Sequence, residues 1–285
     1  MTVVDVAVPA RARVGEGPHW DGAAQLLHWV DILAGQIHST ALDTQTTRTL
    51  QLPWLVGAAV PRRIGGFVAA TSDGFAEVDL DGTYRARHNL LGPGARMNDA
   101  ACDSRGRLWA GSTDMEFAPG GGALHVLHPD WTTQVVLDDL TLPNGLGWSP
   151  DGAVFYLVDT VERHVLAFDA DPDTAVLSRR RVLARFPEGA GQPDGLCVDA
   201  RGNLWIALWG GSQVVRVTPD GKTRERLALP VTQPSSCVFG GPGAATLFVT
   251  SAREGLDPGG GSLDGSVLRV SGLDTFGLPG NLFDG

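Results

Sequence analysis

The sequence predicts an all-β fold, a six-bladed β-propeller with four antiparallel strands in each blade. Three observations carry this prediction. A short motif recurs with a period typical of propeller blades. Windows with the apolar spacing of an amphipathic helix are lacking. Between the motifs, short alternating or apolar runs are separated by Gly, Pro, Asp and Asn, which indicates strands and turns.

The repeated motif is a short polar residue, often preceded by Pro, followed by an apolar run and a turn that contains Gly. It is clearest at 142–152 and again at 193–202, and one weaker copy has Val at the first position. We call the first positions the lead residues: Glu16, Val56, Asn98, Asn144, Asp194 and Ser235. They stand 40 to 50 residues apart, as equivalent residues of successive blades do.

Further strands follow each lead residue. Second strands are predicted at 26–30, 66–70, 107–111, 154–158, 204–208 and 246–250, and third strands at 36–38, 74–78, 123–127, 164–168, 213–217 and 266–270. A fourth, less regular run precedes the next lead residue. One four-stranded sheet cannot bury both of its apolar faces alone, so the units must stack and the ring must close. We therefore expect a single domain over residues 1–285, closed by residues 3–8 as the outer strand of the last blade.

The net charge of the chain limits the classes of partner that it is expected to bind. The chain has 22 Lys and Arg against 32 Asp and Glu, a formal net charge of −10, so phosphate backbones and anionic membranes would repel it. We expect no nucleic-acid and no membrane partner, and the sequence leaves the oligomeric state open. The first residues lack the pattern of a secretory signal, and no apolar run approaches the ~20 residues of a membrane helix. A cytoplasmic location is expected.

The lead residues form the candidate site. Inner strands of a propeller surround a central channel, so equivalent residues converge at one mouth. Glu16, Asn144 and Asp194 would there make an oxygen-only cluster with two negative charges, which suits a hard divalent cation. Asn144 and Asp194, each followed by Gly, also fit hairpin turns when taken singly. The common register of the six copies favours the ring.

Four stretches resemble a known family: Gly15-Glu16-Gly17-Pro18, Arg96-Met97-Asn98-Asp99, Pro143-Asn144-Gly145-Leu146 and Pro193-Asp194-Gly195. Over essentially its whole length the chain resembles the regucalcin/gluconolactonase family of sugar lactonases. The resemblance implies a six-bladed propeller with a divalent metal held by Glu16, Asn144 and Asp194. It also implies that Arg96 and Asn98 contact substrate. Glu116 falls where the family has another substrate-contacting acid, although the family commonly reads Gly-Thr-Met there and this chain has Gly-Ser-Thr-Asp-Met.

The leading hypothesis is a metal-dependent hydrolase that opens an aldonolactone, a pentono- or hexonolactone, to the sugar acid. The metal would polarise the lactone carbonyl and Asp194 would act as the general base. Calcium is the first candidate for the single divalent ion, with magnesium, manganese, zinc and ferrous iron as alternatives. Two other functions are retained: a non-enzymatic calcium-binding propeller that acts as a binding module, and a hydrolase of another ester in the same site.

Overall fold

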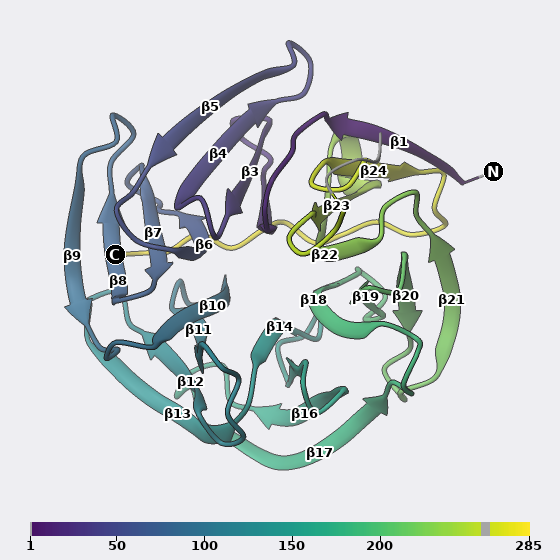
Figure 1. Cartoon of the computed structure of the whole chain (residues 1–285). Helices are drawn as coiled ribbons and strands as arrows, with labels where there is room; N and C mark the ends of the chain where they lie inside the picture. The colour runs from purple at the N-terminus through teal and green to yellow at the C-terminus, as the bar shows by residue number, and fades with distance from the viewer. Residues whose placement is uncertain (1, 258–262) are drawn as a thin grey trace.

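The computed structural model describes residues 2–257 and 263–285. Within these ranges, six four-stranded sheets stand around a central channel (Figure 1). The predicted six-bladed, all-β propeller is confirmed. The helical structure in the described residues is limited to one 3-10 turn, η1 (Pro242–Ala244). None of their helices has the length and apolarity needed to cross a membrane.

Each blade runs outward from the channel in chain order. The inner strands are β2 (Gly15–Asp21), β6 (Val56–Pro61), β10 (Ala95–Cys102), β14 (Pro143–Trp148), β18 (Gln192–Val198) and β22 (Gln233–Gly240). The second strands are β3 (Leu26–Asp31), β7 (Phe67–Thr71), β11 (Leu108–Asp114), β15 (Val154–Asp159), β19 (Leu204–Trp209) and β23 (Thr246–Ala252). The third strands are β4 (Gln36–Ala41), β8 (Gly74–Val78), β12 (Gly122–Leu127), β16 (His164–Ala170), β20 (Gln213–Val217) and β24 (Val267–Ser271). The outer strands are β5 (Thr46–Gln51), β9 (Tyr84–Asn89), β13 (Thr133–Leu140), β17 (Leu177–Arg185), β21 (Thr223–Ala228) and β1 (Val3–Val8).

The last blade is built from both ends of the chain. Strand β1 pairs antiparallel with β24, with Val3 opposite Ser271 and Val6 opposite Leu268. This confirms the predicted closure of the ring by residues 3–8. The pairing completes the last sheet and covers what would otherwise be a free edge on β24.

The hydrophobic core lies between neighbouring blades. In one cluster Trp109 and Leu124 of the third blade pack against Phe155 and Leu157 of the fourth, and all four are at most 1% exposed. Strand β7, the second strand of its blade, is buried on both faces, since every one of its residues is buried. Each blade therefore shields a face of the next, which is why the blades are stable only as a stacked ring.

After β24 the chain does not end at the rim. Residues 272–285, which we call the C-terminal strap, run back across the end of the channel (Figure 1). The Gly277 amide donates to the Ala244 carbonyl at 2.9 Å, and the Phe283 amide donates to the Pro61 carbonyl at 3.0 Å. The strap thus ties the sixth blade to the second. The repeat pattern did not predict it.

Candidate functional site

The inner strands share a register shift at the lead residue. In three of them two inner-strand residues oppose one residue of the second strand: between Met97 and Ala100, between Pro143 and Leu146, and between Pro193 and Leu196. Similar shifts occur at the same level in β2, β6 and β22. A bulge of this kind bends a strand and re-aims its side chains. Asn144 and Asp194 therefore sit in bulges inside strands, and the hairpin-turn interpretation of both residues is wrong.

Glycine after the lead residue allows the inner strands to approach closely. A Cβ atom on Gly195 would lie 2.0 Å from the Ser236 hydroxyl oxygen, and one on Gly145 would lie 2.3 Å from the Leu196 amide nitrogen. Neither glycine has a positive φ, so close approach explains them and turn geometry does not. The contact at Gly145 brings β14 against β18, and with it Asn144 against Asp194.

Asn144 and Asp194 are buried and in direct contact. The Asn144 Nδ2 group donates hydrogen bonds to Asp194 Oδ1 and, at 3.0 Å, to Thr160 Oγ1. Thr160 follows β15 and orients the amide, a role that the sequence did not suggest. No hydrogen bond to Asn144 Oδ1 is found within the described ranges, so this oxygen stays free to coordinate a cation.

Arg96 and Asn98 form a second contact at the same mouth. Arg96 Nη1 donates to Asn98 Oδ1 at 2.6 Å, and Asn98 Nδ2 donates to the Pro143 carbonyl at 3.1 Å. Asn98 is thereby held between the third and fourth blades, directly before Asn144. Arg96 Nη2 and Nε have no hydrogen-bond partner within residues 2–257 and 263–285, so the guanidinium keeps free donors.

The remaining predicted positions make no hydrogen bond to the side chains of this cluster within the described residues. Glu116 is exposed on the loop between β11 and β12, and in the described part of the chain its carboxylate makes no hydrogen bond or ion pair. Val56 is fully buried in the core between the first two blades. Ser235 donates its hydroxyl to the Gly15 carbonyl, so it fastens the sixth blade to the first. Hydrogen bonds and electrostatic interactions connect Glu16, Arg96, Asn98, Asn144 and Asp194, whereas Glu116 stands on the loop that follows β11, the strand paired with Arg96.

Three carboxyl groups share the mouth with a single guanidinium. Burial raises the pKa of Glu16 well above its usual value, and repulsion by Asp194 and Asp99 raises it further. The pKa of Asp194 is also raised, first by burial and then by repulsion from Asp99, while the Asn144 hydrogen bond and Arg96 oppose the shift. Burial lowers the pKa of Arg96, and attraction to Glu16 and Asp194 opposes this. One arginine does not balance this charge, so the site favours an additional cation.

Asp99 is the acid that the sequence reasoning missed. It occupies the second bulge position of β10, and burial raises its pKa to about 7 against the effect of a 2.8 Å hydrogen bond from the Ala100 amide. The signal that could have identified Asp99 from the sequence is its position immediately after a lead residue. A second polar residue within the same bulge is also directed by the bulge toward the channel.

These residues fit a hard divalent cation. The donors are the carboxylates of Glu16 and Asp194 and the free amide oxygen of Asn144, and oxygen donors of this kind suit calcium or magnesium. In the described ranges no three His, Cys, Asp or Glu side chains gather as a ligand group. The predicted set does not require such a group, because its third ligand is an amide.

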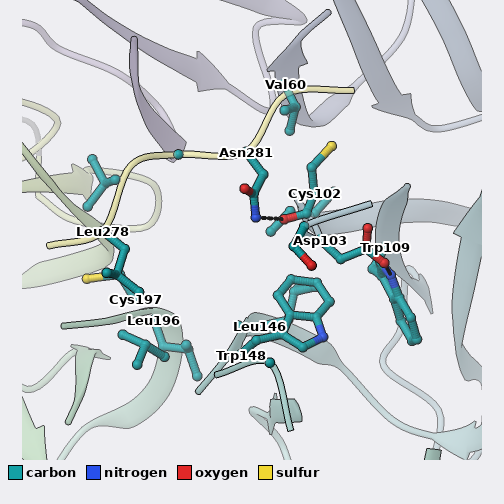
Figure 2. Close-up of a pocket in the computed structure, with 18 of the residues that line it drawn as sticks. Val60, Cys102, Asp103, Trp109, Leu146, Trp148, Leu196, Cys197, Leu278 and Asn281 are labelled. Atoms are coloured by element: carbon teal, nitrogen blue, oxygen red, sulfur yellow. Dashed lines mark hydrogen bonds between the residues drawn. The ribbon is translucent and has the colours of Figure 1, made fainter. Parts of the chain in front are cut away.

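A cavity lies at the other end of the channel. It has a volume of about 620 Å³ and is lined by the later residues of the inner strands, such as Leu146, Trp148 and Leu196, and by the strap (Figure 2). Glu16, Asn144 and Asp194 do not line it, whereas Asp99 does. We call this cavity the lower chamber. The chemistry expected at the lead residues therefore sits above it.

Comparison with known proteins agrees with this architecture. The model of the family described as "SMP-30/Gluconolactonase/LRE-like region" matches residues 14–253. The chain belongs to this family. It is similar to a regucalcin of Danio rerio, with 35% identity over 285 residues that cover 97% of this chain and 96% of the relative. The regucalcin/gluconolactonase resemblance is confirmed.

Two solved structures of similar proteins share the fold. The structure of a luciferin-regenerating enzyme superposes with a TM-score of 0.93 at 30% identity, covering all of both chains. That of a calcium-binding protein, regucalcin, from Agrobacterium tumefaciens superposes with a TM-score of 0.91 at 28% identity, covering 98% of this chain and 96% of the other. Both structural similarities extend over the whole propeller.

Proposed function

We propose that this family member is a metal-dependent lactonase that hydrolyses an aldonolactone, a pentono- or hexonolactone, to the sugar acid. The observation that carries the proposal is the proximity of three buried side chains, Glu16, Asn144 and Asp194, with Arg96 beside them. The excess of negative charge there supports one divalent cation, with calcium first among the candidates. The description of the family to which the chain belongs includes the word gluconolactonase, which agrees with a sugar lactone as substrate.

Asp194 is the proposed general base. A bound cation would polarise the lactone carbonyl and stabilise the negative charge that develops on its oxygen. The Asp194 carboxylate takes a proton from the water that attacks the carbonyl carbon, and the ring ester bond breaks as its oxygen is protonated. Burial raises the pKa of Asp194, which makes its carboxylate a stronger base than a surface aspartate. Asn144 holds that carboxylate in place through its amide.

Arg96 and Asn98 are proposed to orient the sugar. The hydrogen bond to Asn98 fixes the Arg96 guanidinium, and its unpaired N–H groups can donate to substrate hydroxyls. Glu116 is proposed to contact substrate from the loop between β11 and β12, where its carboxylate is exposed and makes no hydrogen bond or ion pair in the described part of the chain. Its removal should therefore affect KM more than kcat.

The test is a panel of sugar lactones assayed after chelation and addition of single divalent ions. Turnover that needs an added ion and is lost in Glu16→Ala supports the lactonase. Ion binding without turnover of any lactone would instead support a calcium-binding propeller, a function favoured by the calcium-binding relative from Agrobacterium tumefaciens. Turnover confined to other esters would place a different substrate in the same site. The uncatalysed rate is subtracted at each pH, because lactones also hydrolyse spontaneously.

A further inference from the structure

The lower chamber is a walled cavity that the proposed lactonase does not use. Leu146, Trp148 and Leu196 form its sides, and Val60 and Leu278 lie at its edges (Figure 2). The Trp148 ring is half-buried, and it packs edge-on against Trp109 and obliquely against Phe155. A volume of about 620 Å³ is within the range of ~300–1,000 Å³ found for small-molecule sites.

The strap covers the chamber between two fixed points. Gly277 is held by its bridge to Asp199, and Phe283 is fully buried and forms a bridge to Arg62. Residues 278–282 between these points are mostly exposed. Within the described chain they have one hydrogen bond, from Asn281 Nδ2 to the Cys102 carbonyl at 3.1 Å (Figure 2). Displacement of this span would break that hydrogen bond and separate Gly280 from the His19 ring, while the bonds at both anchors could stay in place.

Three polar groups in the chamber wall have no partner within residues 2–257 and 263–285. They are His19 Nε2, which is buried, the indole N–H of Trp148 and Oδ1 of Asn281. Burial lowers the pKa of His19 to about 4, so its ring is neutral near neutral pH. Of the three, only His19 Nε2 is buried, and the other two belong to side chains open to solvent, so a ligand in the chamber could hydrogen-bond to them.

The charge around the chamber disfavours an anion. Its cation, Arg107, is already bonded to Asp103 at 2.6 Å and to the Pro172 carbonyl at 2.6 Å. Asp151 and Asp171 also line the chamber. A sugar acid would bring a further carboxylate against these acids, so the ligand is chemically unlike the product proposed at the lead residues.

We infer that the lower chamber is a second binding site, and that it takes a neutral planar aromatic molecule with a hydrogen-bonding substituent. The ring would stack on Trp148 among the aliphatic side chains, and the substituent would meet Asn281 or His19. None of the lead residues lines the chamber, and the inference does not depend on the proposed lactonase activity.

The test compares two fluorescent probes that share one ring system. N-phenylnaphthylamine is neutral, and anilinonaphthalenesulfonate carries a sulfonate. We expect saturable binding of the neutral probe and at least about tenfold weaker binding of the anionic one. The titration is run at about 0.3 M salt, so that the general negative charge of the protein is screened over a few ångströms and only nearby acids discriminate.

Two variants test whether the probe binds in the lower chamber. Leu278→Asp puts a carboxylate on a residue that is 41% exposed, so folding is preserved, and it should weaken the neutral probe at least about tenfold. The matched control is Leu80→Asp, at a position 56% exposed on the turn before β9, and it should leave probe affinity unchanged. Trp148→Leu should also weaken the probe, with its fold checked by thermal unfolding because this ring packs on two others.

Several results would overturn the inference. They are no saturable binding of the neutral probe, equal binding of both probes, or equal weakening by Leu278→Asp and Leu80→Asp. Displacement of the probe by a sugar lactone would also overturn it, since the two sites would then be one. Asp194→Asn should leave probe binding intact whether or not the lactonase proposal holds.

Discussion

The two ends of the central channel are built from the same six inner strands but differ in chemistry. At the lead residues, bulges turn Asn98, Asn144 and Asp194 inward, and three acids face one arginine. At the lower chamber the same strands present Leu146, Trp148 and other apolar groups under the strap. The backbone repeat fixes where side chains converge, and the residue at each level decides what can bind there.

The difference also lies in how each end is held. Close approach of inner strands through Gly145 and Gly195 fixes the upper end, where a Cβ atom would collide with the next blade. A chain segment outside the repeat, anchored at Phe283, covers the lower end. We therefore expect substitutions at one end to leave binding at the other largely unchanged, except at Asp99, which lines the lower chamber and also acts electrostatically on Glu16 and Asp194.

The largest effect is expected for Asp194→Asn. The amide keeps an oxygen for the cation but cannot accept a proton near neutral pH, so turnover should fall by roughly two to four orders of magnitude at saturating cation. Lactone hydrolysis and cation binding by calorimetry are measured on the same preparation. Near wild-type turnover in the cation-saturated variant would limit Asp194 to ligation, and the base would have to be another group.

The strap is tested by Phe283→Ala. This side chain is fully buried against Val60 and Cys102, so its loss should reduce the free energy of unfolding by about 3–5 kcal/mol. The control is Phe276→Ala in the same strap, where the ring is 51% exposed and a small effect is expected. Urea unfolding measures both. Similar losses in the two variants would mean that Phe283 does not anchor the strap.

Asn144→Ala and Asn281→Ala make the same change at opposite ends of the channel. Asn144→Ala removes a proposed ligand atom and should weaken cation binding at least about tenfold, a free-energy change of about 1.4 kcal/mol. Asn281→Ala removes the hydrogen bond to Cys102 and should leave cation affinity at the wild-type value. Both affinities are measured by titration after chelation. Comparable affinity in the two variants would remove Asn144 from the ligand set.

The last prediction concerns a pH dependence of stability in chelated protein. Burial raises the pKa of Asp99 from 3.8 to about 7, so the folded state favours its protonated form. The stability that this gives is complete below about pH 4 and is lost as the pH rises through about 7. Thermal unfolding between about pH 5 and about pH 8 should therefore show a falling midpoint, with a shallower slope in Asp99→Asn, because the raised pKa values of Glu16 and Asp194 act in the same direction. An unchanged slope would mean that Asp99 does not titrate in this window.

The sequence predicted the ring well because the ring repeats. Lead residues 40 to 50 positions apart gave the blade count, and the second strands fall within a residue or two of their predicted bounds at each start. Residues 3–8 were placed correctly because of the strand count. The repeat supplies five complete blades and a sixth that lacks its outer strand, so the missing strand was assigned to the N-terminal end of the chain. Periodicity thus carries information even where single strands are ambiguous.

The rest of the site escaped prediction for physical reasons. The strap has no repeat, and its fully buried anchor, Phe283, has partners some two hundred positions earlier in the chain. Thr160 acts through a hydrogen bond to Asn144 that only the packing of β14 against β15 creates. The Glu116 position comes from a motif match on a loop, and loop conformation is weakly determined by such a match. Its role stays a prediction.

The pairing of β1 with β24 has a consequence for the time course of synthesis. Residue 271 is translated 263 residues after residue 8, which takes roughly 15 to 50 s at about 5–20 residues per second. Throughout that interval the segment Val-Val-Asp-Val-Ala-Val has no native partner and is an apolar strand with free edges. Asp5 interrupts it with a charge that disfavours pairing with another nascent chain. On this view the acid, half-exposed beside Arg269 in the finished blade, matters most before the blade exists.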